Sequence, residues 1–255
     1  MSFVRAKKHL GQHFLKDGEA ARRIAGSLTL HGGCRQVLEV GPGTGALTQH
    51  LLERDDIDLA CIEIDHESVV HLRGKWPGLH VIEGDLLRMD LDAISGGPLG
   101  IIGNFPYNIS TEIVFKVLGN RDRIPEVVGM FQKEVADRLG AGPGSRTYGI
   151  TSVLTQLWYA VEPLFIVEPG AFIPPPKVRS AVIRMRRNER MRLPVDERLL
   201  TSLVKTAFGQ RRKTLHNALK AFAPLAGGVP GEYAGKRAEQ LCVEDWIALA
   251  GACRG

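Results

Sequence analysis

The stretch that decides the fold is Glu39-Val-Gly-Pro-Gly-Thr-Gly45, which ends an apolar run at residues 36–40 and leads into helix-forming residues. Glycines between a strand and a helix let the backbone turn tightly and approach a ligand at the carboxyl edge of a sheet. Gly41, Gly43 and Ala46 fit a dinucleotide fingerprint, but an S-adenosylmethionine site uses the same turn. A tight turn that binds no ligand is the third interpretation.

Short apolar runs alternate with helix-like stretches from residue 36 to about residue 132, which is typical of βαβ units in a mostly parallel sheet. Two later apolar runs, residues 161–167 and 178–185, predict an antiparallel pair at the sheet edge. The other strands are expected at residues 36–40, 58–64, 80–83, 100–103 and 127–131, and helices at 44–53, 67–73, 111–118 (with Ser110 as N-cap) and 150–159.

The composition changes beyond Arg187 to helix formers without β-branched runs. Residues 196–208, 214–222 and 244–252 predict three short helices. We therefore expect a sheet domain over residues 1–187 and a small all-α domain over residues 188–255.

The composition also excludes several classes of protein. With 255 residues, 44% hydrophobic and 24% charged, the chain matches soluble globular proteins and can bury a core without disulfides or metal. The most apolar stretch, residues 148–173, is interrupted by acidic residues and prolines, so we expect no membrane-spanning segment. The four cysteines include no CxxC pair and the eight histidines no metal-ligand spacing, so we expect no metal.

Positive charge is concentrated in two segments. Residues 1–23 hold six Lys/Arg against two acids, and residues 177–220 hold thirteen against three. Such an excess favours an anionic partner, although a solvated surface is the alternative interpretation.

Two acids follow later strands. Glu63 and Asp85 lie at expected strand ends, so both carboxylates should face the crevice beside the glycine loop. One can accept hydrogen bonds from ribose hydroxyls, and the other from the exocyclic amine of an adenine. Strand-end acids also cap helices, which is the alternative role for both.

Asn104-Phe-Pro-Tyr107, which follows the strand at residues 100–103, is the most informative stretch. An aromatic amine is a poor nucleophile because its lone pair is delocalised into the ring. The Asn104 side-chain oxygen and the Phe105 carbonyl, which Pro106 leaves free of sheet pairing, can accept the two amine hydrogens and direct the lone pair at a sulfonium methyl. Tyr107 can stack on the base. A plain strand-end turn is the alternative.

Six motifs in this order resemble the ribosomal RNA adenine N6,N6-dimethyltransferases of the KsgA type. They are Lys8-His-Leu-Gly-Gln-His-Phe-Leu15, Glu39-Val-Gly-Pro-Gly-Thr-Gly45, Asn104-Phe-Pro-Tyr-Asn-Ile-Ser110, Phe131-Gln-Lys-Glu-Val135, Phe172-Ile-Pro-Pro-Pro-Lys-Val178 and Phe208-Gly-Gln-Arg-Arg-Lys-Thr-Leu215. The resemblance implies an α/β fold, with a Rossmann-like S-adenosylmethionine-dependent methyltransferase sheet followed by a C-terminal helical domain that binds rRNA.

The resemblance also implies roles for individual residues. Phe172 would be the second aromatic residue that sandwiches a flipped adenine against Tyr107. His13 stands where many family members have Asn. The residues implied to contact the cofactor or the target are His13, Leu15, Gly41, Gly43, Glu63, Asp85 and Asn104, and the candidates for RNA phosphate contacts are Lys177, Arg179, Arg184, Arg186, Arg187, Arg211, Arg212 and Lys213.

The implied activity is dimethylation of two adjacent adenosines in a loop near the 3′ end of small-subunit (16S) rRNA, inside a partly assembled subunit. The cofactor would be S-adenosylmethionine, with S-adenosylhomocysteine as product and no metal, in a cytoplasmic monomer. Three alternatives are a large-subunit rRNA methylase of the erythromycin-resistance type, a non-catalytic RNA-binding assembly factor and a nicotinamide oxidoreductase. The intact tetrapeptide and the full C-terminal helical segment favour the small-subunit dimethyltransferase.

Overall fold

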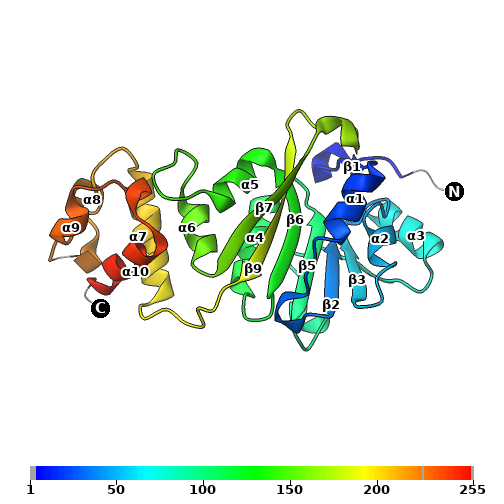
Figure 1. Cartoon of the computed structure of the whole chain (residues 1–255), viewed down its shortest axis with the longest axis horizontal. Helices are drawn as coiled ribbons and strands as arrows, with labels where there is room; N and C mark the ends of the chain where they lie inside the picture. The colour runs from blue at the N-terminus through cyan, green and yellow to red at the C-terminus, as the bar shows by residue number, and fades with distance from the viewer. Residues whose placement is uncertain (1–3, 226, 254–255) are drawn as a thin grey trace. The chain divides into compact units, whose positions relative to one another are not determined.

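The computed structural model describes residues 4–225 and 227–253. The described residues pack as two compact units, and Figure 1 shows their helices and strands. The first unit contains the sheet and draws on Met1–Ala136 and Ala160–Arg187, and the second draws on Asp137–Tyr159 and Asn188–Gly255. The expected boundary after Arg187 coincides with a change of unit. Residues 137–159, however, pack with the C-terminal helices, so the units differ from the expected division at 187/188.

The first unit is built on a seven-stranded sheet with strand order β4-β3-β2-β5-β6-β9-β7. The first five of these strands are parallel, and β9 is antiparallel to β6. Each expected strand is present, but the last strand in the chain inserts between β6 and β7. The bounds are β2 (Gln36–Val40), β3 (Asp58–Glu63), β4 (His80–Glu83), β5 (Leu99–Asn104), β6 (Glu126–Gln132), β7 (Tyr159–Val167) and β9 (Ser180–Arg187).

Strand order reverses at β2, because β2 pairs with β3 on one side and with β5 on the other. Ligands of open parallel sheets bind at such a switch point, outside the carboxyl ends of the strands. The glycine loop follows β2 and the Asn104 tetrapeptide follows β5, so both motifs lie at this point of the sheet.

The helices of the first unit differ from the expected ones at several ends. The helix expected at residues 44–53 is shorter and spans residues 48–51. Gly45 has a left-handed φ of +80°, so the helix cannot include it. Ser110 is the first residue of its helix and its hydroxyl donates to the Tyr107 carbonyl, so the predicted N-cap role is wrong. The bounds are α1 (Gly18–Ala25), α2 (Thr48–Leu51), α3 (His66–Lys75) and α4 (Ser110–Gly119), and α5 (Lys133–Gly140) continues into the second unit.

A two-stranded ribbon joins the N-terminal segment to the loop after β7. It pairs β1 (Phe14–Leu15) with β8 (Phe172–Ile173) in antiparallel register, Leu15 opposite Phe172. The Lys16 N–H extends the pairing by donating to the Ala171 carbonyl at 2.8 Å. Segments more than 150 positions apart in the chain are thereby fixed side by side.

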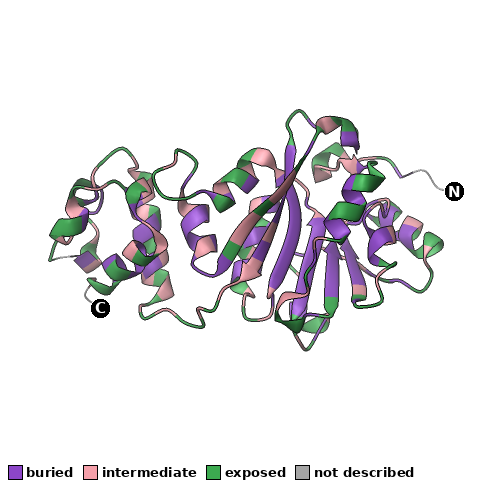
Figure 2. Ribbon diagram, viewed as in Figure 1, coloured by how far each residue is buried: buried purple, intermediate pink, exposed green. Residues whose placement is uncertain are grey.

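Apolar side chains on the strands and on α1 form the core of the first unit. The Val/Ile/Leu runs are buried on both faces, as Figure 2 shows in purple along β2, β5 and β6. One cluster joins Ile24 of α1 to Val37, Met130 and Val182 of three strands. Phe172 is part of the same cluster and is 1% exposed.

The second unit is helical. Asp196 caps α7 by accepting from the Leu199 N–H at 2.7 Å, and Leu200, Leu203 and Trp246 are buried between helices. None of the helices in the described ranges combines the length and apolar character that a membrane crossing needs. The bounds are α6 (Ile150–Gln156), α7 (Glu197–Gly209), α8 (Leu215–Ala218), α9 (Gly231–Ala234) and α10 (Val243–Gly251), and short 3-10 turns occur in both units at Lys8–Leu10, His31–Gly33, Leu91–Ala93, Pro169–Ala171, Ala223–Leu225 and Ala238–Gln240.

Candidate active site

A pocket lies at the carboxyl ends of β2, β3 and β5. It brings together residues that three separate motifs and a strand-end acid predicted. Its lining also includes five residues that the motifs did not single out. The lining residues are Leu10, Gly11, Gln12, His13, Phe14, Gly41, Gly43, Glu63, Ile64, Asn104, Phe105, Pro106 and Tyr107.

The glycine loop needs its glycines for conformation and for space. Gly41 and Gly43 have φ of +66° and +55°, in the left-handed region that other residues rarely adopt. A Cβ added to Gly43 would lie 2.8 Å from two carbons of the Phe14 ring. The loop therefore fits directly against the N-terminal segment, which forms another part of the pocket lining.

Glu63 is the acid of the pocket. Its side chain is buried, with Oε2 accepting from the Gly43 N–H at 3.0 Å and Oε1 from the Asp65 N–H at 2.9 Å. Burial raises the pKa of Glu63, and these backbone hydrogen bonds offset part of the rise. Each carboxylate oxygen has a second lone pair, so Glu63 can still accept hydrogen bonds from hydroxyl groups of a ligand.

Glu39, one strand away, is a different kind of acid. It is 1% exposed, it is not among the lining residues, and the Cys61 thiol donates to its Oε2 at 3.6 Å. Burial raises the pKa of Glu39 to about 7. Glu39, the first residue of the glycine-loop motif, therefore belongs to the interior of the protein and not to the pocket.

The N-terminal segment fixes the amide of Asn104. Asn104 Nδ2 donates to the His13 carbonyl at 2.9 Å. Because only the amide nitrogen can donate to a carbonyl, this contact sets which way the amide group points. Asn104 Oδ1 is thereby left to accept a hydrogen bond from another group in the pocket.

The His13 ring is held in the same region. Its Nδ1 lies 2.8 Å from the Pro174 carbonyl, which can only accept, so Nδ1 carries the hydrogen and Nε2 is the acceptor of the neutral ring. The ring centroid lies 5.3 Å from that of Tyr107, with the planes tilted by 31°. His13 therefore contributes its carbonyl to Asn104 and its ring to Tyr107.

The side chains of the tetrapeptide at residues 104–107 lie partly at the pocket and partly in the core. The Tyr107 hydroxyl is hydrogen-bonded to the buried Ser180 hydroxyl at 2.6 Å, and burial raises the pKa of Tyr107. The Phe105 ring is buried and packs edge-on against Phe131 at 5.1 Å. The part of Phe105 with a predicted role is its backbone carbonyl, and the Phe105 N–H donates to the Met130 carbonyl at 3.2 Å.

Two predicted residues lie in the core and outside the pocket lining. Leu15 is 5% exposed and Phe172 is 1% exposed, and both belong to the apolar cluster of the first unit. The Phe172 ring is covered by core side chains in this structure, and the sandwich of a base between Tyr107 and Phe172 stays a prediction. The ring that lies beside Tyr107 is that of His13.

Asp85 follows β4, next to the strand that ends in Glu63. Its Oδ1 accepts from the Leu87 N–H at 2.9 Å, and its Oδ2 lies 3.5 Å from Arg88 Nε. Asp85 therefore caps a turn, whereas the alternative interpretation was a helix cap. The side chain is 29% exposed, and it is not among the residues that line the pocket.

The predicted RNA-contacting cations fall into three groups. Arg184 is held by Glu162 at 2.6 Å and by the Ser27 carbonyl at 3.0 Å, and Arg211 by Glu239 at 2.6 Å and the Ser145 carbonyl at 3.1 Å. More distant acids face Arg179 (Glu168, 4.0 Å), Arg186 (Glu162, 3.6 Å) and Arg187 (Asp122, 3.8 Å). Lys177, Arg212 and Lys213 are exposed.

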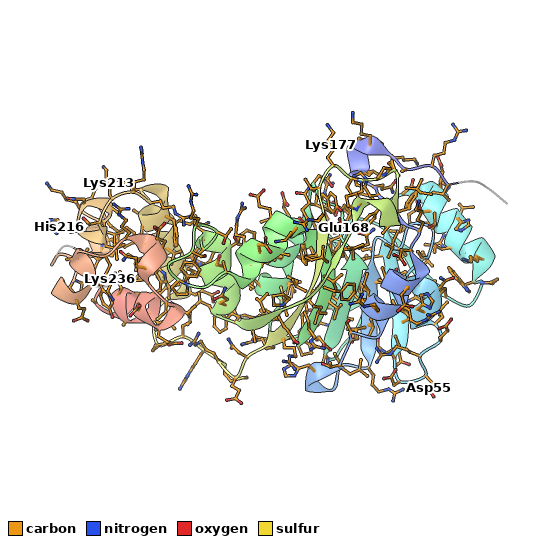
Figure 3. All side chains as sticks on the ribbon, turned by 45° about the horizontal axis from the view of Figure 1, so that its top comes forward. Asp55, Glu168, Lys177, Lys213, His216 and Lys236 are labelled. Atoms are coloured by element: carbon orange, nitrogen blue, oxygen red, sulfur yellow. The ribbon has the colours of Figure 1, made fainter. Side chains whose placement is uncertain are left out.

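The second unit adds basic residues to this set. The Leu215 N–H donates to the Lys236 carbonyl at 2.7 Å, and Thr214 pairs with Arg237. The backbones beside Lys213 and Lys236 are thus adjacent, and Figure 3 labels both residues on the second unit. The Lys236 ammonium group lies 5.3 Å from the centroid of the Tyr233 ring. Arg237 is exposed as well. Sequence spacing gave no sign of this proximity.

Leu10–Phe14 and Ile64 complete the lining, yet the sequence motifs singled out only His13 among them. The glycine at position 11 is the signal in the sequence, and the structure gives its reason: Gly11 has a φ of +65°, and a Cβ there would collide with the Asn108 side chain. The other contacts depend on long-range packing.

The strand order with an inserted antiparallel β9, the glycine loop and the Asn104 pocket together define the Rossmann-like, S-adenosylmethionine-dependent methyltransferase class. A family model described as ribosomal RNA adenine dimethylase matches residues 3–226. The chain belongs to this ribosomal RNA adenine dimethylase family. The sequence-based predictions of fold class and of an rRNA adenine dimethyltransferase are therefore confirmed.

Individual relatives agree over nearly the whole chain. The chain is 51% identical to "Ribosomal RNA small subunit methyltransferase A" of Cytophaga hutchinsonii, over 100% of both chains. A dimethyladenosine transferase structure from Plasmodium falciparum has 26% identity and a TM-score of 0.77, covering 93% of this chain and 96% of that one. The 23S rRNA methyltransferase ErmE has 26% identity and a TM-score of 0.70, covering 94% and 99%.

Proposed function

We propose that this enzyme transfers methyl groups to the N6 atoms of two adjacent adenosines near the 3′ end of small-subunit rRNA. The observation that carries the proposal is the Asn104 amide, whose donor is used by His13 and whose oxygen is left as an acceptor in the pocket. The identity of 51% to a small-subunit methyltransferase over the full chain supports the small subunit, against 26% to ErmE.

The pocket suits S-adenosylmethionine, which supplies an electrophilic methyl group when bound. Glu63 has acceptor capacity for ribose hydroxyls, and Gly41 and Gly43 of the glycine loop line the same pocket. Gly41, Gly43, Glu63 and His13 would hold the cofactor. Asp85 would accept from the adenine amine through a remaining lone pair of its carboxylate, since the Leu87 N–H uses only one of them.

The tetrapeptide orients the target amine. Asn104 Oδ1 and the Phe105 carbonyl accept its two hydrogens, which favours a pyramidal nitrogen and exposes its lone pair. Tyr107 offers a face on which the base stacks, with its hydroxyl anchored to Ser180. The target adenosine has to leave its stack to reach this pocket, which suits an unpaired loop. The methylated nitrogen is acidic and loses its proton afterwards to solvent or to a neighbouring acceptor.

The decisive experiment supplies labelled S-adenosylmethionine with small subunits that lack the methyl groups, and identifies the nucleosides formed. We expect N6,N6-dimethyladenosine at two adjacent positions. Parallel reactions with large subunits test the alternative activity, and label confined to the large subunit would contradict the proposal. No transfer to either subunit would favour a non-catalytic RNA-binding factor. Sedimentation of the enzyme and its localisation in cells test the proposed cytoplasmic monomer.

The exposed cations of the second unit are proposed to contact rRNA phosphates. Replacing Arg212 and Lys213 by Gln should reduce the slope of log K against log salt by about 0.7–0.9 for each phosphate group that the protein no longer neutralises. Arg211→Gln is the matched comparison, since Glu239 and Ser145 already hold its guanidinium and we expect the parent slope. Filter binding at several salt concentrations measures the slopes. Parallel lines for the double variant and the parent would mean that RNA docks elsewhere.

A further inference from the structure

Lys7 joins the N-terminal segment to the start of α3. Its ammonium group forms an ion pair with the Asp65 carboxylate and lies 3.1 Å from Glu67 Oε1. The Lys7 side chain is 29% exposed and that of Asp65 only 1%, so the pair reaches into the protein interior. The backbone N–H of Lys7 donates to Gln12 Oε1 at 2.8 Å, which closes the segment on itself.

Asp65 connects Lys7 to the pocket. Its carboxylate caps α3 by accepting from the Ser68 N–H at 3.3 Å and from the Ser68 hydroxyl at 2.7 Å. Its own N–H donates to Glu63 Oε1 at 2.9 Å, while Glu63 Oε2 accepts from the Gly43 N–H at 3.0 Å. A continuous set of polar contacts therefore runs from Lys7 to the glycine loop.

The charges in this set depend on Lys7. Burial raises the pKa of Glu63, and the nearby charge of Asp65 raises it further. Burial also acts to raise the pKa of Asp65, but the hydrogen bonds from Lys7 and Ser68 outweigh it and hold that pKa below its usual value. Without Lys7, the Asp65 carboxylate would be a buried charge that lacks its cation.

The segment that Lys7 anchors is part of the pocket wall. Leu10–Phe14 line the pocket, and the Phe14 ring fills the space beside Gly43. The carboxyl end of this segment is fixed by pairing of β1 with β8. Its amino end is fixed by the Lys7 ion pair.

We propose that Lys7 is a positioning residue for the cofactor pocket. Its ion pair with Asp65 holds residues 7–13 closed over the pocket and thereby slows the release of bound cofactor. The inference rests on the proposed use of this pocket for S-adenosylmethionine. Lys7 itself touches neither the methyl group nor the target base in this scheme, since its ammonium group is bound to the two acids at the start of α3.

The test compares three variants with the parent protein. Lys7→Gln removes the charge, Lys7→Arg keeps it, and Lys8→Gln removes the charge of the exposed neighbour. Stopped-flow displacement of bound S-adenosylmethionine measures the dissociation rate. We expect Lys7→Gln to release the cofactor about tenfold faster, the effect of removing one charged hydrogen bond. Lys7→Arg and Lys8→Gln should stay within about twofold of the parent, because both keep a cation at position 7.

A second measurement does not depend on the cofactor. Amide hydrogen exchange of residues 10–14 in the ligand-free protein should become faster in Lys7→Gln and stay unchanged in Lys8→Gln. If the parent binds S-adenosylmethionine and Lys7→Gln has the same release rate and the same hydrogen exchange as the parent, the positioning role of Lys7 is wrong. The proposed function would be unaffected by that result. A parent that binds no S-adenosylmethionine overturns the proposed function, and the inference with it.

Discussion

Asn104→Ala is expected to lower the single-turnover rate of methyl transfer by about 10²-fold or more, because a misoriented reacting group costs that much in rate. The Asn104 amide is held by the His13 carbonyl at 2.9 Å, so its oxygen is presented to the pocket in a fixed direction. RNA affinity should change by less than about threefold, since we propose that the phosphate contacts that dominate it are made by the exposed cations of the second unit. Rapid-quench assays with saturating enzyme give the rate, and filter binding gives the affinity.

The matched control is Asn120→Ala. Asn120 follows the last residue of α4, and its side-chain amide donates to the Lys116 carbonyl. It is not among the residues that line the pocket. We expect parent activity in this variant. Transfer by Asn104→Ala within about threefold of the parent, equivalent to roughly 0.65 kcal/mol in the barrier, would disprove the amine-orienting role.

Phe172→Ala is expected to lower the free energy of unfolding of the first unit by about 3–5 kcal/mol, because it removes a fully buried aromatic ring. Phe172 packs in the same cluster as Leu15, Val167 and Val182, so its loss leaves a cavity in the core. Amide hydrogen exchange of β2, β5 and β6 reports on this unit specifically. Phe172→Leu keeps most of the volume and should cost less than about 1.5 kcal/mol.

Phe115→Ala is the matched control, since Phe115 is 41% exposed on α4. Its replacement should lower the free energy of unfolding much less than Phe172→Ala does, because less apolar surface is lost from the core. This experiment also decides between two roles for Phe172. A Phe172→Ala protein with parent stability and no methyl transfer would restore the stacking role that the family resemblance implied. Loss of stability, with transfer retained in Phe172→Leu, would assign the residue to the core.

Much of the fold follows from local sequence. The apolar runs predicted the bounds of β2 and of the edge strand β4 without error, and those of β3, β5 and β6 within one residue. The central strands are easy to find because strands covered on both faces are nearly continuously apolar. The short α1 and α5 escaped notice. In α1 the buried residues Ala20, Ala21, Ile24 and Ala25 are mostly small, and much of what stabilises such short helices is tertiary packing.

The residues of the candidate site also include some that the sequence predicts and some that it does not. The glycine loop, Glu63 and Asn104 could be predicted because parallel strands place their carboxyl ends at one edge, whatever the rest of the chain does. Of Leu10–Phe14, only His13 was predicted, and that through the family resemblance. The other four could not be predicted, because the segment reaches the pocket through an ion pair to Asp65 and a ribbon with β8.

By itself, the sequence determined the strand-loop motifs, the α/β class and the family, since each rests on residues that are neighbours in the chain. Only the tertiary structure decided the insertion of β9, the burial of Phe172, and which arginines are held by acids of the protein itself. Arg184 meets Ser27 and Glu162, and Arg211 meets Glu239, through contacts between residues 157, 22 and 28 positions apart. The physical reason is that burial and charge pairing depend on partners that chain topology supplies, and no local pattern specifies them.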